Sequence, residues 1–135
     1  MEEKVVLDLN TIISGALFHG NEAAILDLVR SGKIKALISR KMTGRLATAL
    51  SYPHLAKYLH GKKPADIMVS ALKNFEIVDD VEEKHQFQLD SDDSTVLQCA
   101  VHNQVTLISG DKKLLEIKIY RNTHIITSAQ FLKRA

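Results

Sequence analysis

The run KVVLDLNTII, residues 4–13, decides the fold. It begins as an apolar strand pattern and meets a single acid, Asp8, where that pattern ends. Much later in the chain VTLISGDKKLL, residues 105–115, repeats the arrangement with Asp111. A short apolar run bounded by polar residues is typical of a buried strand. The two runs therefore predict two buried strands, each followed directly by a carboxylate.

Strand and helix patterns alternate along the chain. We expect strands at residues 5–7, 35–39, 75–80, 105–109 and 123–127, and helices at residues 21–30, 41–50, 64–74 and 92–103, after Asp111, and from Ser128. The run VEEKHQFQ, residues 81–88, has no clear period and is predicted as a loop. Alternation of this kind favours right-handed crossovers between parallel strands. The predicted fold is a three-layer α/β/α sandwich with a central parallel sheet of about five strands.

Length and composition favour one domain over residues 1–135. A chain of 135 residues that is 45% hydrophobic can bury a substantial core. Its one cysteine, Cys99, cannot form an internal disulfide, and no signal-peptide pattern opens the chain at Met1. No apolar stretch approaches the roughly 20 residues of a membrane helix. We therefore expect a cytoplasmic protein with no membrane segment.

The charge and the histidines exclude little. A net charge of +2 permits a nucleic-acid partner without indicating one. The six histidines are scattered, and none lies near another or near Cys99 at the spacing of a zinc site. Zinc is therefore not expected.

The acids after the strands suggest a metal site. Carboxyl ends of parallel strands meet at one edge of a sheet, so Asp8 and Asp111 converge if their strands are neighbours. A third acid lies in LDSDDSTVLQCAV, residues 89–101, at a predicted helix start. Each acid alone is explained by helix capping. Together, like charges about 5 Å apart repel by about 3 kcal/mol per pair, which a cation reverses. Hard oxygen ligands suit Mg²⁺ or Mn²⁺ and favour metal-assisted phosphodiester hydrolysis.

Three motifs give the chain a family likeness. The first is DLNTIIS at residues 8–14, an aspartate and an asparagine ahead of an apolar run. The last is SGDKKLL at residues 109–115. Between them lies an acid pair with apolar positions beyond it, at Asp92, Asp93, Leu97 and Ala100. In order and spacing these motifs resemble the PIN domain family, in particular its toxin-type (VapC-like) ribonucleases of toxin-antitoxin pairs, along most of the chain.

The resemblance implies roles for particular residues. Asp8, Asp93 and Asp111 would be the catalytic metal ligands for Mg²⁺ or Mn²⁺, with Asn10 and Ser109 supporting them through hydrogen bonds. Asp92 is the nearest competitor to Asp93. The implied partners are an RNA substrate and a small antitoxin protein.

One position departs from the family pattern. Arg45 stands in SRKMTGRLATAL, residues 39–50, where the family usually has a glutamate. Its spacing from Met42 and Ala49 places it at the border of an apolar helix stripe, so we expect it at the edge of the cleft. There it would repel a divalent ion and either pair with an aspartate or hold an RNA phosphate; the ordinary alternative is a solvated side chain. Weakened catalysis is as well supported as full activity.

Basic and aromatic residues could border an RNA track. Basic candidates are Lys33, Lys35, Arg40, Lys41, Arg45, Lys112 and Lys113, although such charges are usually solvated surface. The aromatic candidates outside the expected core are Phe18, Tyr52 and Tyr58. The segment 52–63 has apolar residues at helical spacing and is explained equally by a homodimer interface and by core packing.

Two other functions compete with a nuclease. A catalytically degenerate PIN domain would bind RNA or a protein without cutting. A phosphoacceptor signalling domain also has an aspartate after an apolar strand, but it needs a pair of acids on an earlier strand. Asp8 follows the first strand here, with only Glu2 and Glu3 before it, so the signalling reading is weak.

Overall fold

The central element is a six-stranded sheet in a computed structural model that describes residues 3–82 and 84–134. Its strands run in the order β3-β2-β1-β4-β6-β5. Their bounds are β1 (Lys4–Leu7), β2 (Lys35–Ser39), β3 (Glu76–Val78), β4 (Thr106–Ile108), β5 (Ile119–Tyr120) and β6 (Thr123–Ile126). The pairs from β3 through β6 are parallel, and β5 alone pairs antiparallel, with β6. The five predicted strands are confirmed, and β5 is a sixth.

The antiparallel β5 escaped prediction because its turn carries no glycine. Arg121 and Asn122 form the two-residue connection between Tyr120 and Thr123, which pair across the hairpin. Both connecting residues have positive φ, 48° and 67°. Tight hairpins of this type favour asparagine and glycine, so an arginine in the first position hides the signal.

Helices fill the connections between strands, as the alternation predicts. They are α1 (Leu9–Leu17), α2 (Asn21–Arg30), α3 (Arg40–Leu50), α4 (Pro64–Ala71), α5 (Ser91–Asn103), α6 (Lys112–Ile117) and α7 (Ser128–Lys133), with a 3₁₀ helix, η1 (Pro53–Tyr58). Helix α1 was not expected, because the β-branched run Thr11, Ile12 and Ile13 reads as strand. Of the predicted loop at residues 81–88, residues 81, 82 and 84–88 are neither helix nor strand, and Glu83 lies outside the described residues.

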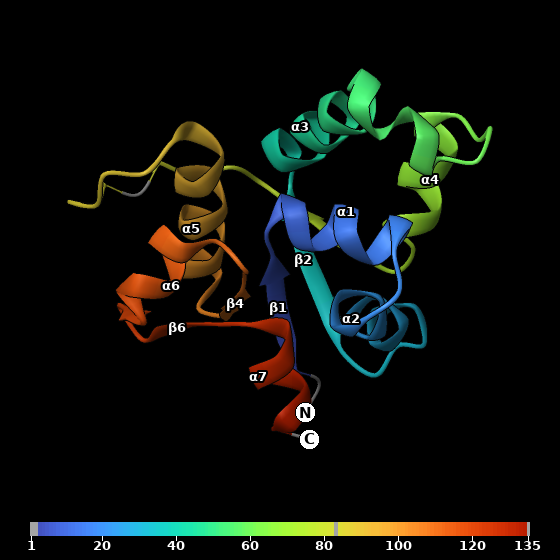
Figure 1. The fold of residues 1–135 in the computed structure, drawn as a ribbon. Helices are drawn as coiled ribbons and strands as arrows, with labels where there is room; N and C mark the ends of the chain where they lie inside the picture. The colour runs from blue at the N-terminus through green and yellow to red at the C-terminus, as the bar shows by residue number, and fades with distance from the viewer. Residues whose placement is uncertain (1–2, 83, 135) are drawn as a thin grey trace.

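The helices flank both faces of the sheet and complete the predicted α/β/α sandwich (Figure 1). Helix α2 packs against α1 and α7, while α5 packs against β1, β4 and α3. Helices α3 and α4 also contact each other and α1, and η1 joins them at the top of Figure 1. The hydrophobic core runs through the central strands, where Val5, Val6, Leu7, Leu107 and Ile108 are fully buried.

Among the described residues, no single helix is long and apolar enough to cross a membrane. Helices α1 and α2 meet that test only as a pair, across a bend of 91°.

Candidate metal and nucleic-acid site

The two strands that precede the predicted acids are neighbours at the centre of the sheet. Leu7, the last residue of β1, is in register with Ile108, the last residue of β4. The amide of Asp8 then donates to the carbonyl of Ile108 at 3.1 Å, which extends the ladder by one step. Asp8 and the segment that holds Asp111 therefore leave the sheet side by side, as the sequence predicts.

Asp8 is held by both of its carboxylate oxygens. One oxygen accepts from the amide of Thr11 at 2.7 Å, which caps α1, and the other accepts from the hydroxyl of Ser109. The Ser109 hydroxyl in turn accepts from the amide of Asp111 at 2.9 Å. Asp8 and Ser109 are 4% and 0% exposed, so this link is buried. Ser109 thus connects the two strand-end acids through hydrogen bonds.

Asp111 and Asp90 cap two other helices that begin beside Asp8. Asp111 accepts from the amide of Leu114 at 3.1 Å at the start of α6. Asp90 accepts from the amide of Asp93 at 2.8 Å at the start of α5. Capping and clustering are therefore not alternatives here. The positive ends of three helices converge on the acids and offset part of their mutual repulsion.

The acids line one pocket of about 300 Å³, which we call the carboxylate pocket. Its lining residues are Asp8, Leu9, Asn10, Ile13, Arg45, Thr48, Ala49, Tyr52, Asp90, Asp92, Asp93, Val96 and Asp111. The structure thus brings together every acid that the sequence singled out, with Asn10 beside them. Asp90 was missed, although an acid three residues before Asp93 is the spacing of a helix cap.

The clustering of the acids changes the pKa of Asp93. The pKa of Asp93 is raised from 3.8 to about 6, first by burial and then by the charges of Asp111, Asp90, Asp8 and Asp92. A pKa shift of this kind marks a carboxylate whose ionised form lacks a compensating cation. A positive charge that enters the pocket would therefore favour the ionised form of Asp93.

Arg45 supplies the one guanidinium among the lining residues. It lies 3.1 Å from the Asp92 carboxylate and donates to the Ser91 carbonyl at 2.8 Å. It also donates to the hydroxyls of Thr95 and Ser91, both at 2.7 Å. Arg45 therefore lies at the edge of the pocket, as its helical spacing predicts, with its donors engaged by the first turn of α5. Asp92 is correspondingly drawn toward Arg45.

Comparison with known proteins gives the chain a family. The model of the PIN domain matches residues 4–113, a span that contains all five acids of the carboxylate pocket. The chain belongs to the PIN domain family.

Relatives of this PIN domain are known as a sequence and as structures. An uncharacterized protein of Methanocaldococcus jannaschii, MJ1680, is 26% identical over 116 residues, which cover 85% of this chain and 75% of that protein. A chain of VapBC2 from Rickettsia felis, solved bound to a DNA fragment from its promoter, superposes with a TM-score of 0.62 at 17% identity over 90% of this chain and 96% of that one. PAE2754 from Pyrobaculum aerophilum superposes with a TM-score of 0.61 at 14% identity, covering 98% and 88%. Both structural likenesses bear on the fold.

PIN nucleases generally use divalent metal ions, and the donors of this PIN domain fit such an ion in kind. Carboxylate oxygens at strand ends are the ligands that Mg²⁺ and Mn²⁺ prefer. Within residues 3–82 and 84–134, however, no three His, Cys, Asp or Glu side chains are already close enough together to hold an ion. The acids therefore line one pocket without forming a preassembled metal site among the described residues.

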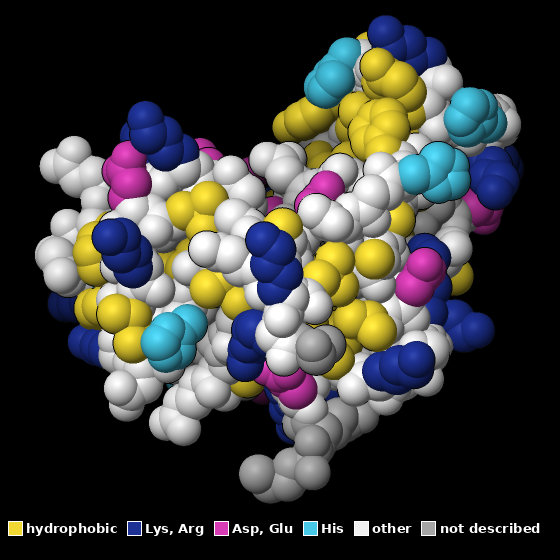
Figure 2. Space-filling view, turned by 60° about the horizontal axis from the view of Figure 1, so that its bottom comes forward, with side chains coloured by type: hydrophobic (Ala, Val, Ile, Leu, Met, Phe, Trp, Pro, Cys, Tyr) yellow, Lys and Arg dark blue, Asp and Glu magenta, His cyan; other side chains and the backbone are white. Residues whose placement is uncertain are grey.

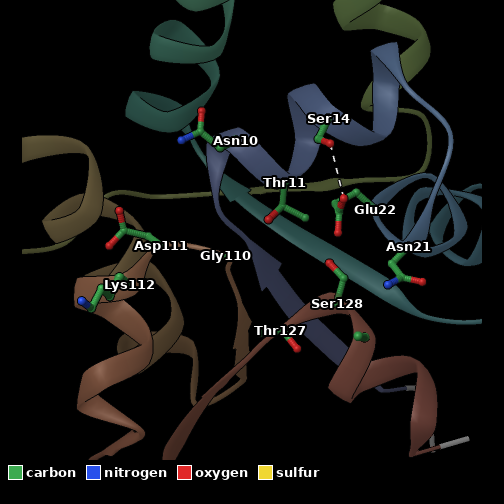
Figure 3. Close-up of a pocket in the computed structure, with 11 residues that line it drawn as sticks. Asn10, Thr11, Ser14, Asn21, Glu22, Gly110, Asp111, Lys112, Thr127 and Ser128 are labelled. Atoms are coloured by element: carbon green, nitrogen blue, oxygen red, sulfur yellow. Dashed lines mark hydrogen bonds between the residues drawn. The ribbon is translucent and has the colours of Figure 1, made fainter.

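A second pocket of about 500 Å³ adjoins the carboxylate pocket and shares Asn10 and Asp111 with it (Figure 3). It is lined by Asn10, Thr11, Ser14, Asn21, Glu22, Gly110, Asp111, Lys112, Thr127, Ser128 and Ala129. The hydroxyl of Ser14 donates to Glu22 at 3.4 Å across it. Lys112, a predicted RNA contact, lines this second pocket and lies on the same side as Asp111 in Figure 3.

Proposed function

We propose that this PIN domain is a metal-dependent endoribonuclease and the toxin of a toxin-antitoxin pair. PIN domains are generally nucleases, and the superposition on a chain of a VapBC complex supports the toxin role. The observation that carries the proposal is the convergence of Asp8, Asp93 and Asp111 on one pocket at the ends of β1 and β4.

In this proposal Asp8, Asp93 and Asp111 would hold Mg²⁺ or Mn²⁺. Such an ion supplies charge at the scissile phosphate and lowers the pKa of a bound water. The Ser109 hydroxyl donates to the Asp8 carboxylate and holds it in place. The amide of Asp111 donates to the same hydroxyl and fixes the position of Ser109. Asn10, in the first turn of α1, borders both pockets, and its proposed role is to support the acids through hydrogen bonds.

RNA is the proposed substrate, with Lys112 as a contact to a phosphate beside the acids. The proposed protein partner is a small antitoxin, by analogy with VapBC2, which was solved as a complex. Asp92 is proposed to support the site indirectly, because its carboxylate is already paired with Arg45.

The test is incubation of single-stranded RNA with Mn²⁺ and three proteins. Wild type should cleave, and Asp8→Asn should not, because an amide replaces one oxygen of the proposed ligand while the other oxygen can still cap α1. Arg45→Glu should cleave faster than wild type, because it restores an acid beside the pocket. Equal activity in all three proteins would refute the site.

The contacts of Arg45 favour one second candidate, a PIN domain that binds RNA or a protein without cutting. A guanidinium tied into the pocket opposes a divalent ion through its charge. Thermal unfolding with and without Mn²⁺ separates the two functions. A competent site gains stability with ion concentration as ligand linkage requires, and a degenerate one does not respond.

A further inference from the structure

An exposed tyrosine stands at the mouth of the carboxylate pocket. Tyr52 lies between α3 and η1, lines the pocket and is 49% exposed. Arg45, Thr48 and Ala49 of α3 line the same pocket, and Tyr52 extends this lining beyond the end of the helix, where its backbone is extended at the start of η1. The Tyr52 ring stacks on His54, with centroids 5.8 Å apart and planes at 30°. One aromatic face is thus fixed beside the acids and accessible to a ligand.

The other aromatic candidates serve a different purpose. Phe18 and Tyr58 contact each other edge to face, with centroids 4.9 Å apart, and Lys57 lies 5.1 Å from the Tyr58 ring. Among the described residues, neither ring lines the carboxylate pocket. Phe18 packs against Tyr58 of η1 instead. This packing anchors the segment that carries Tyr52.

Cations follow Tyr52 without an intervening acid. The segment 52–63, YPHLAKYLHGKK, contains no aspartate or glutamate, and its exposed basic side chains are His54, Lys57, His60, Lys62 and Lys63. In Figure 2 the lobe that protrudes at the upper right carries hydrophobic, histidine and basic side chains together, next to a notch. We call residues 52–63 the aromatic-basic segment.

We propose that the aromatic-basic segment is a binding platform for single-stranded RNA, with Tyr52 stacking on the base next to the scissile phosphate. The reasoning starts from charge. Five acids line the carboxylate pocket, so the pocket itself repels a phosphate backbone. The affinity of the protein for RNA must then come from groups beside the pocket. Exposed rings flanked by cations are the combination that binds single strands without reading sequence.

This inference rests on the proposed function for the identity of the ligand as RNA. The inference adds the side of the pocket from which the RNA strand enters and names Tyr52 as the residue that positions the RNA. A second copy of the chain is the other occupant that an exposed, partly apolar surface admits, and the experiment separates it from RNA.

The experiment is fluorescence anisotropy with a labelled single-stranded RNA of about 12 nucleotides, in EDTA so that no cleavage occurs. Tyr52→Ala should weaken binding about ten-fold, and Tyr52→Phe should bind as wild type, because stacking needs the ring and not the hydroxyl. Val69→Ala is the matched control, since Val69 is 74% exposed on α4 and lies outside the segment. Lys62→Ala with Lys63→Ala should reduce the dependence of the binding constant on salt.

Three outcomes overturn the platform. If Tyr52→Ala binds RNA as tightly as wild type, the Tyr52 ring does not stack on a base. If Tyr52→Phe loses as much affinity as Tyr52→Ala, the hydroxyl and not the ring binds the RNA. A wild-type dimer in sedimentation that Tyr52→Ala converts to a monomer assigns the segment to self-association. Because binding is measured without metal, failure of the nuclease proposal is separate: RNA bound through Tyr52 but uncut in Mn²⁺ refutes cleavage and retains the platform.

Discussion

Arg45 lies 3.1 Å from the carboxylate of Asp92 and thereby ties α3 to α5 across the carboxylate pocket. The contact joins residues that are far apart in sequence, and the backbone carbonyl and hydroxyl of Ser91 strengthen it. A cation that belongs to the protein therefore neutralises one acid of the cluster. This arrangement stabilises the pocket without metal and lowers its attraction for metal.

Replacement of Arg45 separates these two effects. Arg45→Glu should lower the free energy of unfolding in EDTA by about 1–2 kcal/mol, because the contacts to α5 are lost and a second carboxylate faces Asp92. The same change should strengthen Mn²⁺ binding roughly ten-fold or more, since a positive charge becomes negative. Urea unfolding in EDTA and thermal shift against Mn²⁺ concentration measure the two effects.

Arg45→Gln is the control for Arg45→Glu. It removes the same contacts without adding an acid, so it should destabilise the protein in EDTA but strengthen Mn²⁺ binding less than Arg45→Glu does. If both variants bind Mn²⁺ as wild type does, Arg45 has no electrostatic influence on a metal in this pocket.

The pH dependence of stability should report Asp93. Because its pKa is higher in the folded protein, about 6 against 3.8, the folded state binds more protons in this interval, and the free energy of unfolding falls as pH rises through it. Asp93→Asn removes the charge and should be more stable than wild type at pH 7.5, by about 1 kcal/mol after solvent screening or roughly 4 °C in Tm. Thermal unfolding in EDTA measures the difference.

At pH 4.5 the same comparison provides its own control. Asp93 is then largely protonated in the folded state, so the gain of Asp93→Asn over wild type should shrink. In saturating Mn²⁺ at pH 7.5 the order should reverse, because only wild type keeps the proposed ligand. A constant difference at both pH values would show that charge at residue 93 is not its cause.

Local patterns gave most of the fold. The strand at residues 35–39 and the helix at residues 21–30 have the bounds that were predicted, because the apolar pattern defines both and Gly32 follows the end of the helix. Helix α1 was hidden by β-branched residues that favour strand, and it forms because Asp8 caps it and it packs on α2 and α3. Tertiary contacts overrode local preference there.

The candidate site also has features that the sequence predicts and features that depend on tertiary contacts. Convergence of Asp8 and Asp111 followed from the topology of a parallel sheet. Pairing of Arg45 with an aspartate was one of the expected alternatives, and Asp92 is that aspartate. The contacts of Arg45 to Ser91 and Thr95 were not expected, because these residues lie 46 and 50 positions along the chain and no local pattern specifies such contacts. Asp90 was overlooked because the adjacent pair Asp92 and Asp93 offered a stronger motif, although Asp90 is the residue that caps the helix.

Ser109 should be required for stability as well as for geometry. In Ser109→Ala the buried Asp8 carboxylate loses a donor and the Asp111 amide loses an acceptor, which should cost roughly 1–3 kcal/mol in urea unfolding. Ser31→Ala is the matched control, because the exposed Ser31 hydroxyl donates to the Leu28 carbonyl at 3.2 Å and its loss should cost less than about 0.5 kcal/mol. Equal losses would show that the Asp8 link contributes no more than a surface bond.

Two helical glycines should respond to alanine with opposite signs. A Cβ at Gly15 in α1 would lie 2.7 Å from the Glu22 carbonyl oxygen and 2.9 Å from a Leu26 methyl group. The oxygen belongs to the α2 backbone and cannot rotate away, so α2 must move. Gly15→Ala should therefore destabilise the protein by about 1–3 kcal/mol.

Gly44 in α3 provides the comparison. It is exposed, and a Cβ there meets nothing within 4 Å. Gly44→Ala should stabilise the protein by about 0.5–1 kcal/mol, because alanine loses less backbone entropy in a helix. Urea unfolding of both variants measures the two signs. Destabilisation by both would mean that α3 tolerates no side chain at residue 44, and stabilisation by both would mean that α1 and α2 are not in close contact at Gly15. The close contact matters for the site, because α2 carries Asn21 and Glu22 into the second pocket.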